Sequence, residues 1–363
     1  MTGGGVKSVI PGFVTHNIQR IDPETSGVVA WRLKKVGSCA IKVRMKKYRK
    51  ERNWSQYNQN LKKIARVEFF ISEEALEQWN YNGKRKPGGK IIYSDNVIEL
   101  SLILREYYKL AYRQTQGFME SVFDLMKVKV QIPDYTTMSR RCGKLKVSLR
   151  NKLLIPRRQG QLVIAVDSTG LSLYSGREWN RIKHHSQKTS CFDKWRKLHI
   201  AIDIKTGEIL STSCGKSTVN DGEVLPTLLD AIDEPISAIC GDMAYDTVNC
   251  REAIKKKKAR QLIPPMRNAR LVKNNRNLTN RRDILQERDE AIKYINHNTI
   301  NGDKSLARAS WKNKVGYHAR SLVESTMLQI KQHCRDNLTN RKEQNRIVQS
   351  KIKCKIVNLI IAA

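Results

Sequence analysis

Four polar residues in the C-terminal part of the chain have the types and spacing to handle a phosphate group. They follow the pattern Tyr-x2-Arg-x3-Glu-x6-Lys and are Tyr317, Arg320, Glu324 and Lys331. On one α-helix, at ~100° per residue, they fall within an arc of about 60°. A guanidinium and an ammonium suit phosphate binding, and a carboxylate suits a hard metal ion. A charged stripe in solvent is the alternative for a Glu-x6-Lys pair taken alone.

Two further carboxylates follow apolar runs that are typical of buried strands. The first run, 162–166, is followed by Asp167, and the second run, 236–241, is followed by Asp242. The end of such a strand holds a carboxylate on rigid backbone, although a turn or a helix cap would explain either residue alone. Together with Glu324, the two aspartates have the layout by which ribonuclease-H-like nucleases hold two divalent metal ions.

These blocks resemble those of bacterial insertion-sequence transposases of the DDE class, in the branch with the Tyr-Arg-Glu-Lys helix signature. This branch is the IS-four/IS-five superfamily, and the chain is most similar to its IS-five side. All four signature positions match, and the resemblance covers roughly residues 50 to 335. The other segments that resemble family blocks are, in chain order, Tyr93–Asp95, Arg113–Phe118, Pro133–Arg141, Val166–Leu171, Trp195–Asp203 and Gly241–Asp246.

The resemblance implies a catalytic triad of Asp167, Asp242 and Glu324. These residues would hold two Mg²⁺ ions, for which Mn²⁺ substitutes, with Asp167 as the bridging ligand. Two such ions activate the attacking oxygen and stabilise the leaving oxygen of a phosphoryl transfer. The remaining signature residues would contact DNA at the end of the element, and these are Tyr317, Arg320 and Lys331.

The implied reaction is nicking of DNA at the ends of an insertion sequence, followed by attack of the freed 3′-hydroxyl on target DNA. The implied partners are double-stranded DNA, as terminal inverted repeats and as target, and a second copy of the chain in a homodimer on that DNA. Two alternatives remain open. A catalytically inactive or domesticated relative would keep the fold as a DNA-binding regulator. A basic structural nucleic-acid protein would have no need of the three acids.

The composition agrees with a polyanionic partner. The chain has 68 Lys plus Arg against 34 Asp plus Glu, a formal net charge of +34 and a pI of about 10.0. No apolar run approaches the ~18 residues of a membrane-spanning helix, and no signal-peptide pattern opens the chain. Eight scattered cysteines without a C-x2-C pair favour neither a zinc module nor a disulfide framework. We therefore expect a bacterial cytoplasmic protein, associated with the nucleoid and not with a membrane.

Four segments are expected along the chain. Residues 1–44 lack periodicity and family likeness, and form a disordered leader or upstream extension before Met45, or alternatively a short ordered arm on DNA. Residues 45–155 form a helical, helix-turn-helix-like DNA-binding domain. Residues 156–335 form a ribonuclease-H-like catalytic domain of the α/β class, a mixed sheet flanked by helices. Residues 336–363 form a basic helical tail with a packing or dimer surface.

Three helices are expected within 96–150. The middle helix carries an apolar stripe that predicts its buried face, made of Phe118, Val122, Leu125 and Met126. Asp134 caps the third helix, whose exposed side carries the basic residues Arg140, Arg141, Lys144 and Lys146. A basic helix that follows a helix and a turn suits the major groove of DNA. The alternative is a helical bundle whose basic face only keeps it in solution.

The catalytic segment alternates strand and helix signals. Strands are expected at 162–166, 171–174, 198–202, 208–213, 236–240 and 261–263, with turns at 168–170 and 205–207 and helices near 221–232 and 245–258. Residues 264–316 are basic, polar and irregular in pattern, in the interval where some relatives carry an inserted β subdomain.

Several other polar residues of this segment could be mistaken for catalytic ones. Asp203, Asp221 and Asp246 suit turns and caps, and Asp246 is the first replacement to consider if a triad residue fails. His199 alternates along a strand, and we expect it to be packed or to face DNA.

Overall fold

A computed structural model describes residues 53–71, 73–84, 87–151, 154–157, 160–173, 195–272, 282–299 and 301–363. The expected leader at 1–44 lies outside the described residues. The chain divides into two units, 1–61 and 62–363, and the helix α1 (Trp54–Ala65) begins in the first and ends in the second. All that follows concerns the second unit.

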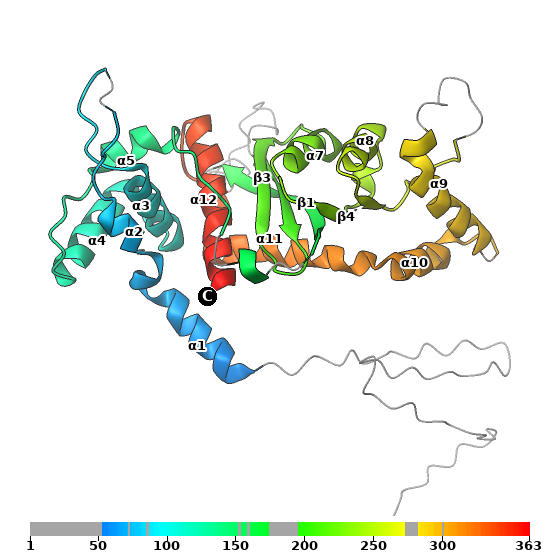
Figure 1. Cartoon of the computed structure of the whole chain (residues 1–363), viewed down its shortest axis with the longest axis horizontal. Helices are drawn as coiled ribbons and strands as arrows, with labels where there is room; N and C mark the ends of the chain where they lie inside the picture. Colours follow the sequence, from blue (N-terminus) through cyan, green and yellow to red (C-terminus); the bar gives the residue numbers. More distant parts are fainter. Residues whose placement is uncertain are drawn as a thin grey trace, which may run out of the picture. The chain divides into compact units, whose positions relative to one another are not determined.

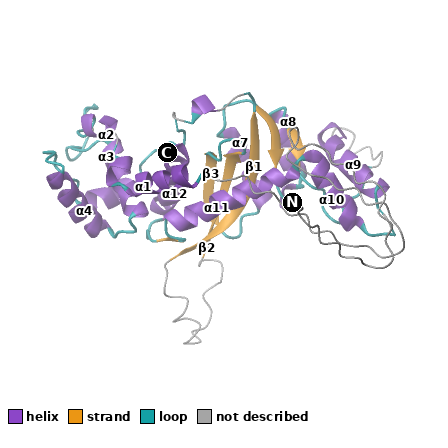
Figure 2. Ribbon diagram, turned by 90° about the horizontal axis from the view of Figure 1, so that it is seen from below, coloured by secondary structure: helices purple, strands orange, loops and turns teal. Residues whose placement is uncertain are grey.

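A mixed six-stranded sheet lies at the centre of this unit, among helices (Figure 2). Its order is β3-β2-β1-β4-β5, with β6 paired to β1. The strands are β1 (Leu162–Leu173), β2 (Trp195–Asp203), β3 (Ile209–Lys216), β4 (Ile236–Cys240), β5 (Arg260–Leu262) and β6 (Asn337–Leu338). The first three are antiparallel, whereas β4 and β6 run parallel to β1, and β5 runs parallel to β4. The expected α/β class, with a ribonuclease-H-like mixed sheet, is confirmed.

The predicted hairpin between β2 and β3 is confirmed. The two strands pair antiparallel, from Arg196 with Lys216 to Ile202 with Ile209. Gly207 has a φ of +77° in the connecting turn, a conformation that glycine adopts without a steric penalty. The turn signal in the sequence therefore placed this hairpin correctly.

The turn predicted at 168–170 is wrong, because β1 continues through it to Leu173. These residues pair with β2, and Gly170 lies opposite Lys197. A Cβ atom on Gly170 would lie 3.2 Å from the Trp195 ring. The glycine thus allows a close approach of a side chain across the strands, and Asp167 lies in the middle of a long strand.

Each face of the sheet is covered by a helix pair. Ile164 and Val166 point into the cluster formed with α7 (Asp221–Asp230) and α8 (Val248–Lys256). Ala165 points into the opposite cluster, with α11 (Ser321–His333) and α12 (Glu343–Ala362). Alternate residues of β1 therefore belong to two cores, and Asp167 shares the face of Ala165.

The helices expected within 96–150 are present. They are α3 (Asp95–Tyr107), α4 (Tyr112–Leu125) and α5 (Tyr135–Cys142), preceded by a 3₁₀ turn at Val67–Phe70 and by α2 (Glu73–Glu77). The stripe predicted for α4 is only partly correct, because Phe118 packs against the helical cluster but the fully buried residues are Thr115, Met119 and Phe123. Leu125 is 81% exposed, since it is the last residue of the helix. The sequence offered two apolar registers one residue apart, and packing of Phe123 against Trp79, with ring centroids 5.0 Å apart, decides between them.

The expected tail at 336–363 is part of the core and not an appended helix. Figure 1 shows α12 beside β3, with α3 on its other side, and both contact it. Ile352 and Ile356 belong to the helical cluster, whereas Cys354 and Val357 belong to a cluster of the sheet. Because apolar residues cover two sides of α12, the helix is buried between two layers.

Residues 264–316 are more helical than expected. They contain α9 (Arg282–His297) and α10 (Lys304–Val315), which pack on each other through Ala291, Ile295, Ala307 and Trp311. Ile295 follows Ala291 by one helical turn, which is helical apolar spacing. The many charged residues between the apolar ones made this spacing hard to recognise in the sequence.

The described residues also bear on the expectations about membranes and cysteines. Among them, no helix is long and apolar enough to cross a membrane. The cysteines described are free thiols, namely Cys142, Cys214, Cys240, Cys250, Cys334 and Cys354.

Candidate active site

The parallel pairing of β1 and β4 places two aspartates side by side. The last residues paired in this ladder are Ala165 and Cys240. Asp167 and Asp242 each lie two residues beyond that pair, where β1 and β4 are no longer paired. Asp242 thus lies at the carboxyl end of β4, where such sheets commonly form sites, and Asp167 lies within β1 beside it.

Asp242 is held by the turn that follows β4. It is the N-cap of the 3₁₀ turn η4 (Met243–Tyr245), and its side chain accepts a hydrogen bond of 2.8 Å from the Ala244 amide. The helix expected at 245–258 begins after this turn, as α8. A residue at such a cap has a fixed side-chain direction.

The sequence predicts that the four signature residues share a single helix, but in the structure they do not. Gly316 ends α10 with a φ of +73°, which favours glycine. Tyr317 and Arg320 then form the 3₁₀ turn η6 (Tyr317–Arg320), and only Glu324 and Lys331 lie on α11. The prediction of one helix for all four residues is therefore wrong. Glu324 and Lys331 nevertheless lie two turns apart on one side of α11.

Arg320 joins two of the three acids. Its Nη1 donates to Oδ2 of Asp167, and its Nη2 donates to Oε1 of Glu324. Burial raises the pKa of Asp167, and the negative charge of Asp242 adds to this effect, against hydrogen bonds from Ser168 and Arg320. Asp167 is thus close to both of the other predicted acids.

The residues present fit divalent cations in chemical type. Three carboxylates offer hard oxygen ligands, and a guanidinium already lies between two of them. Among the described residues, however, no three acid, histidine or cysteine side chains are grouped closely enough to hold a metal ion. Arg320 would have to release the carboxylates before a metal ion could bind.

The other two signature residues, Tyr317 and Lys331, lie on η6 and α11. Burial raises the pKa of Tyr317 to about 12, although the Arg320 charge opposes the shift. The Nζ of Lys312 lies 5.1 Å from the centre of the Tyr317 ring. Lys331 is partly exposed on α11. Arg320 thus brings positive charge to two of the acids and Lys312 brings it to Tyr317, which suits a phosphate chain.

A second polar layer lies on the other face of the sheet. Asp221, the first residue of α7, accepts hydrogen bonds from Nε2 of His199 at 2.9 Å and Nζ of Lys197 at 2.8 Å. Burial opposes ionisation of Asp221, but these hydrogen bonds, together with one from Ser168, lower its pKa. His199 is 1% exposed, so it is packed and does not face DNA. The sequence showed each residue but gave no signal that they meet.

Asp246 is a structural residue and not a spare catalytic one. Its side chain is 1% exposed and accepts hydrogen bonds from Arg251 at 2.7 and 2.9 Å. The Met266 amide donates to it at 2.7 Å, and Arg288 of α9 lies 3.3 Å away. These contacts tie α8 to α9, and they leave Asp246 no room for another ligand.

The basic residues of α5 differ in their surroundings. Asp134 caps the helix as predicted, through a hydrogen bond of 2.8 Å from Thr136. Arg140 is exposed, whereas Arg141 donates to the Tyr93 carbonyl and to the Asp95 carboxylate. The helix ends at Cys142, so Lys144 is exposed but lies beyond it.

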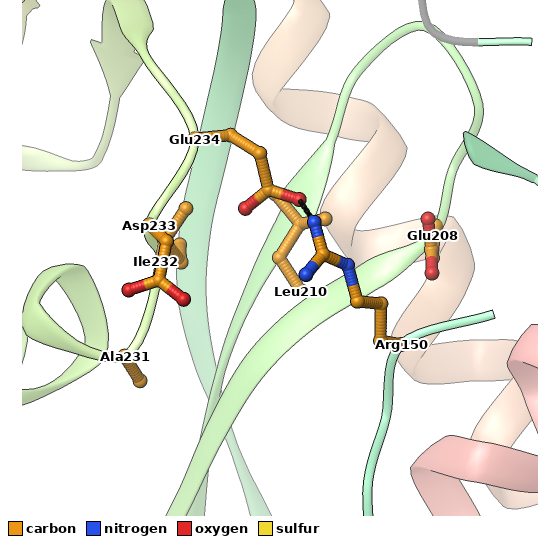
Figure 3. Close-up of a pocket in the computed structure, with 7 residues that line it drawn as sticks. All are labelled: Arg150, Glu208, Leu210, Ala231, Ile232, Asp233 and Glu234. Carbon is orange, nitrogen blue, oxygen red and sulfur yellow. Dashed lines mark hydrogen bonds and ion pairs between the residues drawn. The ribbon is translucent and has the colours of Figure 1, made fainter. Parts of the chain in front are cut away.

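One pocket lies away from the acids (Figure 3). It contains an ion pair of 2.8 Å between Arg150 and Glu234. Its lining shares no residue with the candidate site, and consists of Arg150, Glu208, Leu210, Ala231, Ile232, Asp233 and Glu234.

Comparison with known proteins adds independent information. Two family models, each described as a transposase DDE domain, match residues 62–176 and residues 158–359. The second match alone spans more than half of the 363 residues. A solved structure, the Drosophila P element transposase strand transfer complex, is 10% identical over 85% of each chain, with a TM-score of 0.28. That score is too low to support an argument about the fold.

Proposed function

Because this chain belongs to the transposase DDE-domain family, and is thus a metal-dependent enzyme that cleaves and joins DNA, we propose that Asp167, Asp242 and Glu324 are its catalytic carboxylates. With them it nicks DNA at the ends of its own insertion sequence. It then joins the freed 3′-hydroxyl to target DNA.

One observation carries this assignment. The two aspartates extend two residues beyond the last parallel pair of β1 and β4, and Arg320 connects the first of them to Glu324. Acids from β1, the turn after β4 and α11 thus belong to one region of the sheet, although in the free protein they are not grouped closely enough to hold a metal ion. Elements distant in sequence rarely bring like charges together without a cation or a function to balance them.

The metal ions of this family would be held by the three acids. Two Mg²⁺ ions, or Mn²⁺ in their place, would activate the attacking oxygen and stabilise the leaving oxygen. Asp167 would be the central residue of this set, because β1 pairs with β4, which precedes Asp242, and Arg320 connects Asp167 to Glu324. Within the chain itself, Arg320 keeps Asp167 and Glu324 in place before DNA binds.

In this proposal, DNA phosphates bind the positively charged side chains of Arg320 and Lys331. The planar fork of Arg320 suits two phosphate oxygens as well as two carboxylates, so it exchanges one for the other. Lys331 contacts the same strand from α11. Tyr317 keeps its proton at neutral pH, because its pKa is raised to about 12, and therefore acts as a hydrogen-bond donor to DNA.

Binding of the element ends is proposed for the helical region, 45–155. Arg140 and Lys144 are exposed on and beyond α5 and suit contacts with the duplex. Arg141 supports the same surface from within, since it holds the start of α3 through Asp95. A homodimer would bind the two terminal repeats together. We place the enzyme on the IS-five side of its superfamily, acting at the bacterial nucleoid.

The test is a cleavage assay on the element's own ends. A labelled duplex that contains one terminal inverted repeat is incubated with the purified chain and a target plasmid, with and without Mg²⁺. The proposal predicts Mg²⁺-dependent nicking at the repeat boundary and joining to the plasmid. Tight binding to the repeat without nicking in Mg²⁺ or Mn²⁺ would instead identify a DNA-binding regulator.

A further inference from the structure

The helix α10 carries positive charge without any acidic residue to balance it. Its charged residues are Lys304, Arg308, Lys312 and Lys314, and no acid occurs between Lys304 and Val315. Within the described residues, none of the four forms an ion pair. A helix that carries a stripe of unbalanced cations is typical of a surface that binds a polyanion.

Three of these cations form a row along one side of the helix. Lys304, Arg308 and Lys312 are four residues apart, and like charges at this spacing destabilise a helix unless a partner balances them. The row lies against the segment that follows β5, because Nη1 of Arg308 donates to the Pro265 carbonyl at 2.8 Å and Nη2 donates to the Met266 carbonyl at 3.1 Å.

That segment leaves the sheet at the edge where the candidate aspartates lie. The strands β4 and β5 are parallel, and their last paired residues are Cys240 and Leu262. Arg267 is exposed in this segment. Burial lowers the pKa of Arg308 and the charge of Arg267 lowers it further, although the charge of Asp246 opposes the shift. Arg267 thus adds a fourth cation, and we call the set the basic row: Arg267, Lys304, Arg308 and Lys312.

The other end of the basic row reaches the candidate site. The helix α10 ends at η6, and Nζ of Lys312 lies 5.1 Å from the centre of the Tyr317 ring. The last residue of η6 is Arg320, which holds two of the candidate acids. The helix α3 contacts α12 and α12 contacts α11, whereas α10 contacts α9 and η6. Figures 1 and 2 accordingly show α10 on the side of α11 away from α3.

We propose that the basic row binds phosphates of the duplex that flanks the insertion sequence, just beyond the nicked position. This inference rests on the proposed function, in which the helical region and Lys331 hold the terminal repeat while the acids nick its boundary. A duplex held in this way continues past η6 and along α10. The 12 residues of α10 span about 18 Å, which corresponds to roughly five base pairs of duplex.

The variant Arg267→Ala/Lys304→Ala removes two exposed cations from the row. Neither side chain forms a hydrogen bond or ion pair within the described residues, so the fold should be unaffected. The matched control is Lys256→Ala/Arg260→Ala, which also removes one exposed lysine and one exposed arginine. These residues end α8 and begin β5, at the opposite edge of the sheet.

Binding is measured without Mg²⁺ on two duplexes, one that ends at the repeat boundary and one that continues into flanking DNA. Arg267→Ala/Lys304→Ala should bind the flanked duplex about 10–100-fold more weakly than wild type at about 0.1 M salt, and its slope of log affinity against log salt should fall by about 1.8. It should bind the duplex without a flank as wild type does. The control should match wild type on both duplexes.

The length of the flank provides a second readout. For wild type, affinity should rise as the flank is extended to roughly five base pairs and then remain constant, because α10 reaches no further. Arg267→Ala/Lys304→Ala should show a much smaller rise.

Several results would overturn the inference or its premise. Wild-type affinity of Arg267→Ala/Lys304→Ala for the flanked duplex would show that the basic row does not contact the flank. Equal losses on both duplexes would place the row on the repeat instead. Unchanged binding of both duplexes, with loss of joining to a target plasmid, would assign the row to target DNA. If wild type neither binds nor nicks the repeat, the proposed function itself fails, and this result is distinct from the other three.

Discussion

At the residue scale, Arg320 explains how two of the candidate carboxylates can lie close together without a metal ion. Its side chain is 21% exposed and holds both Asp167 and Glu324. Without a cation, those carboxylates would repel each other at short range. The guanidinium therefore balances the two carboxylates in the free protein, and in the proposed function it competes with metal ions until DNA binds it.

This competition gives a prediction for Arg320→Ala. Without DNA, the variant should bind Mn²⁺ about tenfold more tightly, equivalent to ~1.4 kcal/mol, because no internal cation competes. Its affinity for the terminal repeat should fall. The matched control is Lys331→Ala, which should also lose repeat binding but keep the Mn²⁺ affinity of wild type, since within the described residues Lys331 forms no ion pair or hydrogen bond with these acids. Weaker Mn²⁺ binding by Arg320→Ala would show that Arg320 helps to build the metal site.

Asp167 should oppose folding at neutral pH. A pKa raised above 3.8 means that the folded protein binds this proton more tightly than the unfolded chain does. The cost is thus full above the folded pKa and fades as the pH falls towards 3.8. Asp167→Asn should accordingly be more stable than wild type at pH 7, with no gain in acid. Such a stability cost is common at active sites.

Denaturant unfolding of Asp167→Asn at several pH values tests this sign. The control is Asp134→Asn, at a fully exposed helix cap whose pKa is lowered by hydrogen bonds from Thr136. That carboxylate favours folding above its usual pKa, so its amide should not gain stability at pH 7. A loss of stability in Asp167→Asn at every pH would contradict the burial argument.

At the scale of elements, local sequence patterns located most strands and helices but missed their limits. The β2–β3 hairpin, β4, β5 and the cap of α5 by Asp134 were predictable, because each depends on nearby residues. The continuation of β1 through Gly170 was not, since pairing with β2 and the Trp195 ring decide it. Likewise, Gly316 divides the signature motif between two elements.

Gly241 connects β4 to the candidate site, and we expect this position to accept no side chain. In Gly241→Ala, the new Cβ would press on Tyr245 and Val166, which typically costs about 1–3 kcal/mol. The control is Gly215→Ala on β3, where the nearest atom, Cγ2 of Val219, lies at 3.9 Å. Urea unfolding should show a clear loss for the first variant and little change for the second. Equal midpoints would mean that the turn after β4 adapts freely.

At the scale of the whole molecule, α12 joins the helical region to the sheet through a buried polar network. Lys353 is fully buried, and its Nζ lies 3.1 Å from Oε2 of Glu106 and donates to the Arg335 carbonyl at 2.6 Å. Glu106 also contacts the neighbouring Arg105. A buried charge without its partner is costly, whereas an apolar replacement of a whole pair often is not.

Lys353→Ala should therefore lower the free energy of unfolding by about 3–5 kcal/mol. The double variant Glu106→Gln/Lys353→Met should recover only part of this loss, because buried Arg105 then lacks its carboxylate partner. Exposed Lys342 at the start of α12 provides the control, and its change to Ala should matter by less than ~0.5 kcal/mol. Chemical denaturation of the four proteins checks the order, and an unchanged midpoint for Lys353→Ala would refute it.

The sequence placed the candidate acids but not the layer that supports them. Asp167, Asp242, Glu324 and Arg320 could be chosen in advance, because short contiguous motifs contain them, although Asp167 lies within β1 and Arg320 precedes α11. Asp221 could not, since its contacts with His199 and Lys197 of β2 exist only in the folded chain. The net charge of +34 indicated a polyanionic partner, yet it could not tell exposed Arg140 from engaged Arg141.

The central claim is that three carboxylates perform the chemistry. The most direct test measures nicking of a labelled terminal-repeat duplex in Mg²⁺ by Asp167→Asn, Asp242→Asn and Glu324→Gln, with repeat binding measured in parallel. We predict that each variant loses at least about a hundredfold in nicking rate. Each should bind the repeat as tightly as wild type or slightly more tightly, because one negative charge beside the phosphates is removed. Near wild-type nicking by any one of the three would contradict the assignment of that residue.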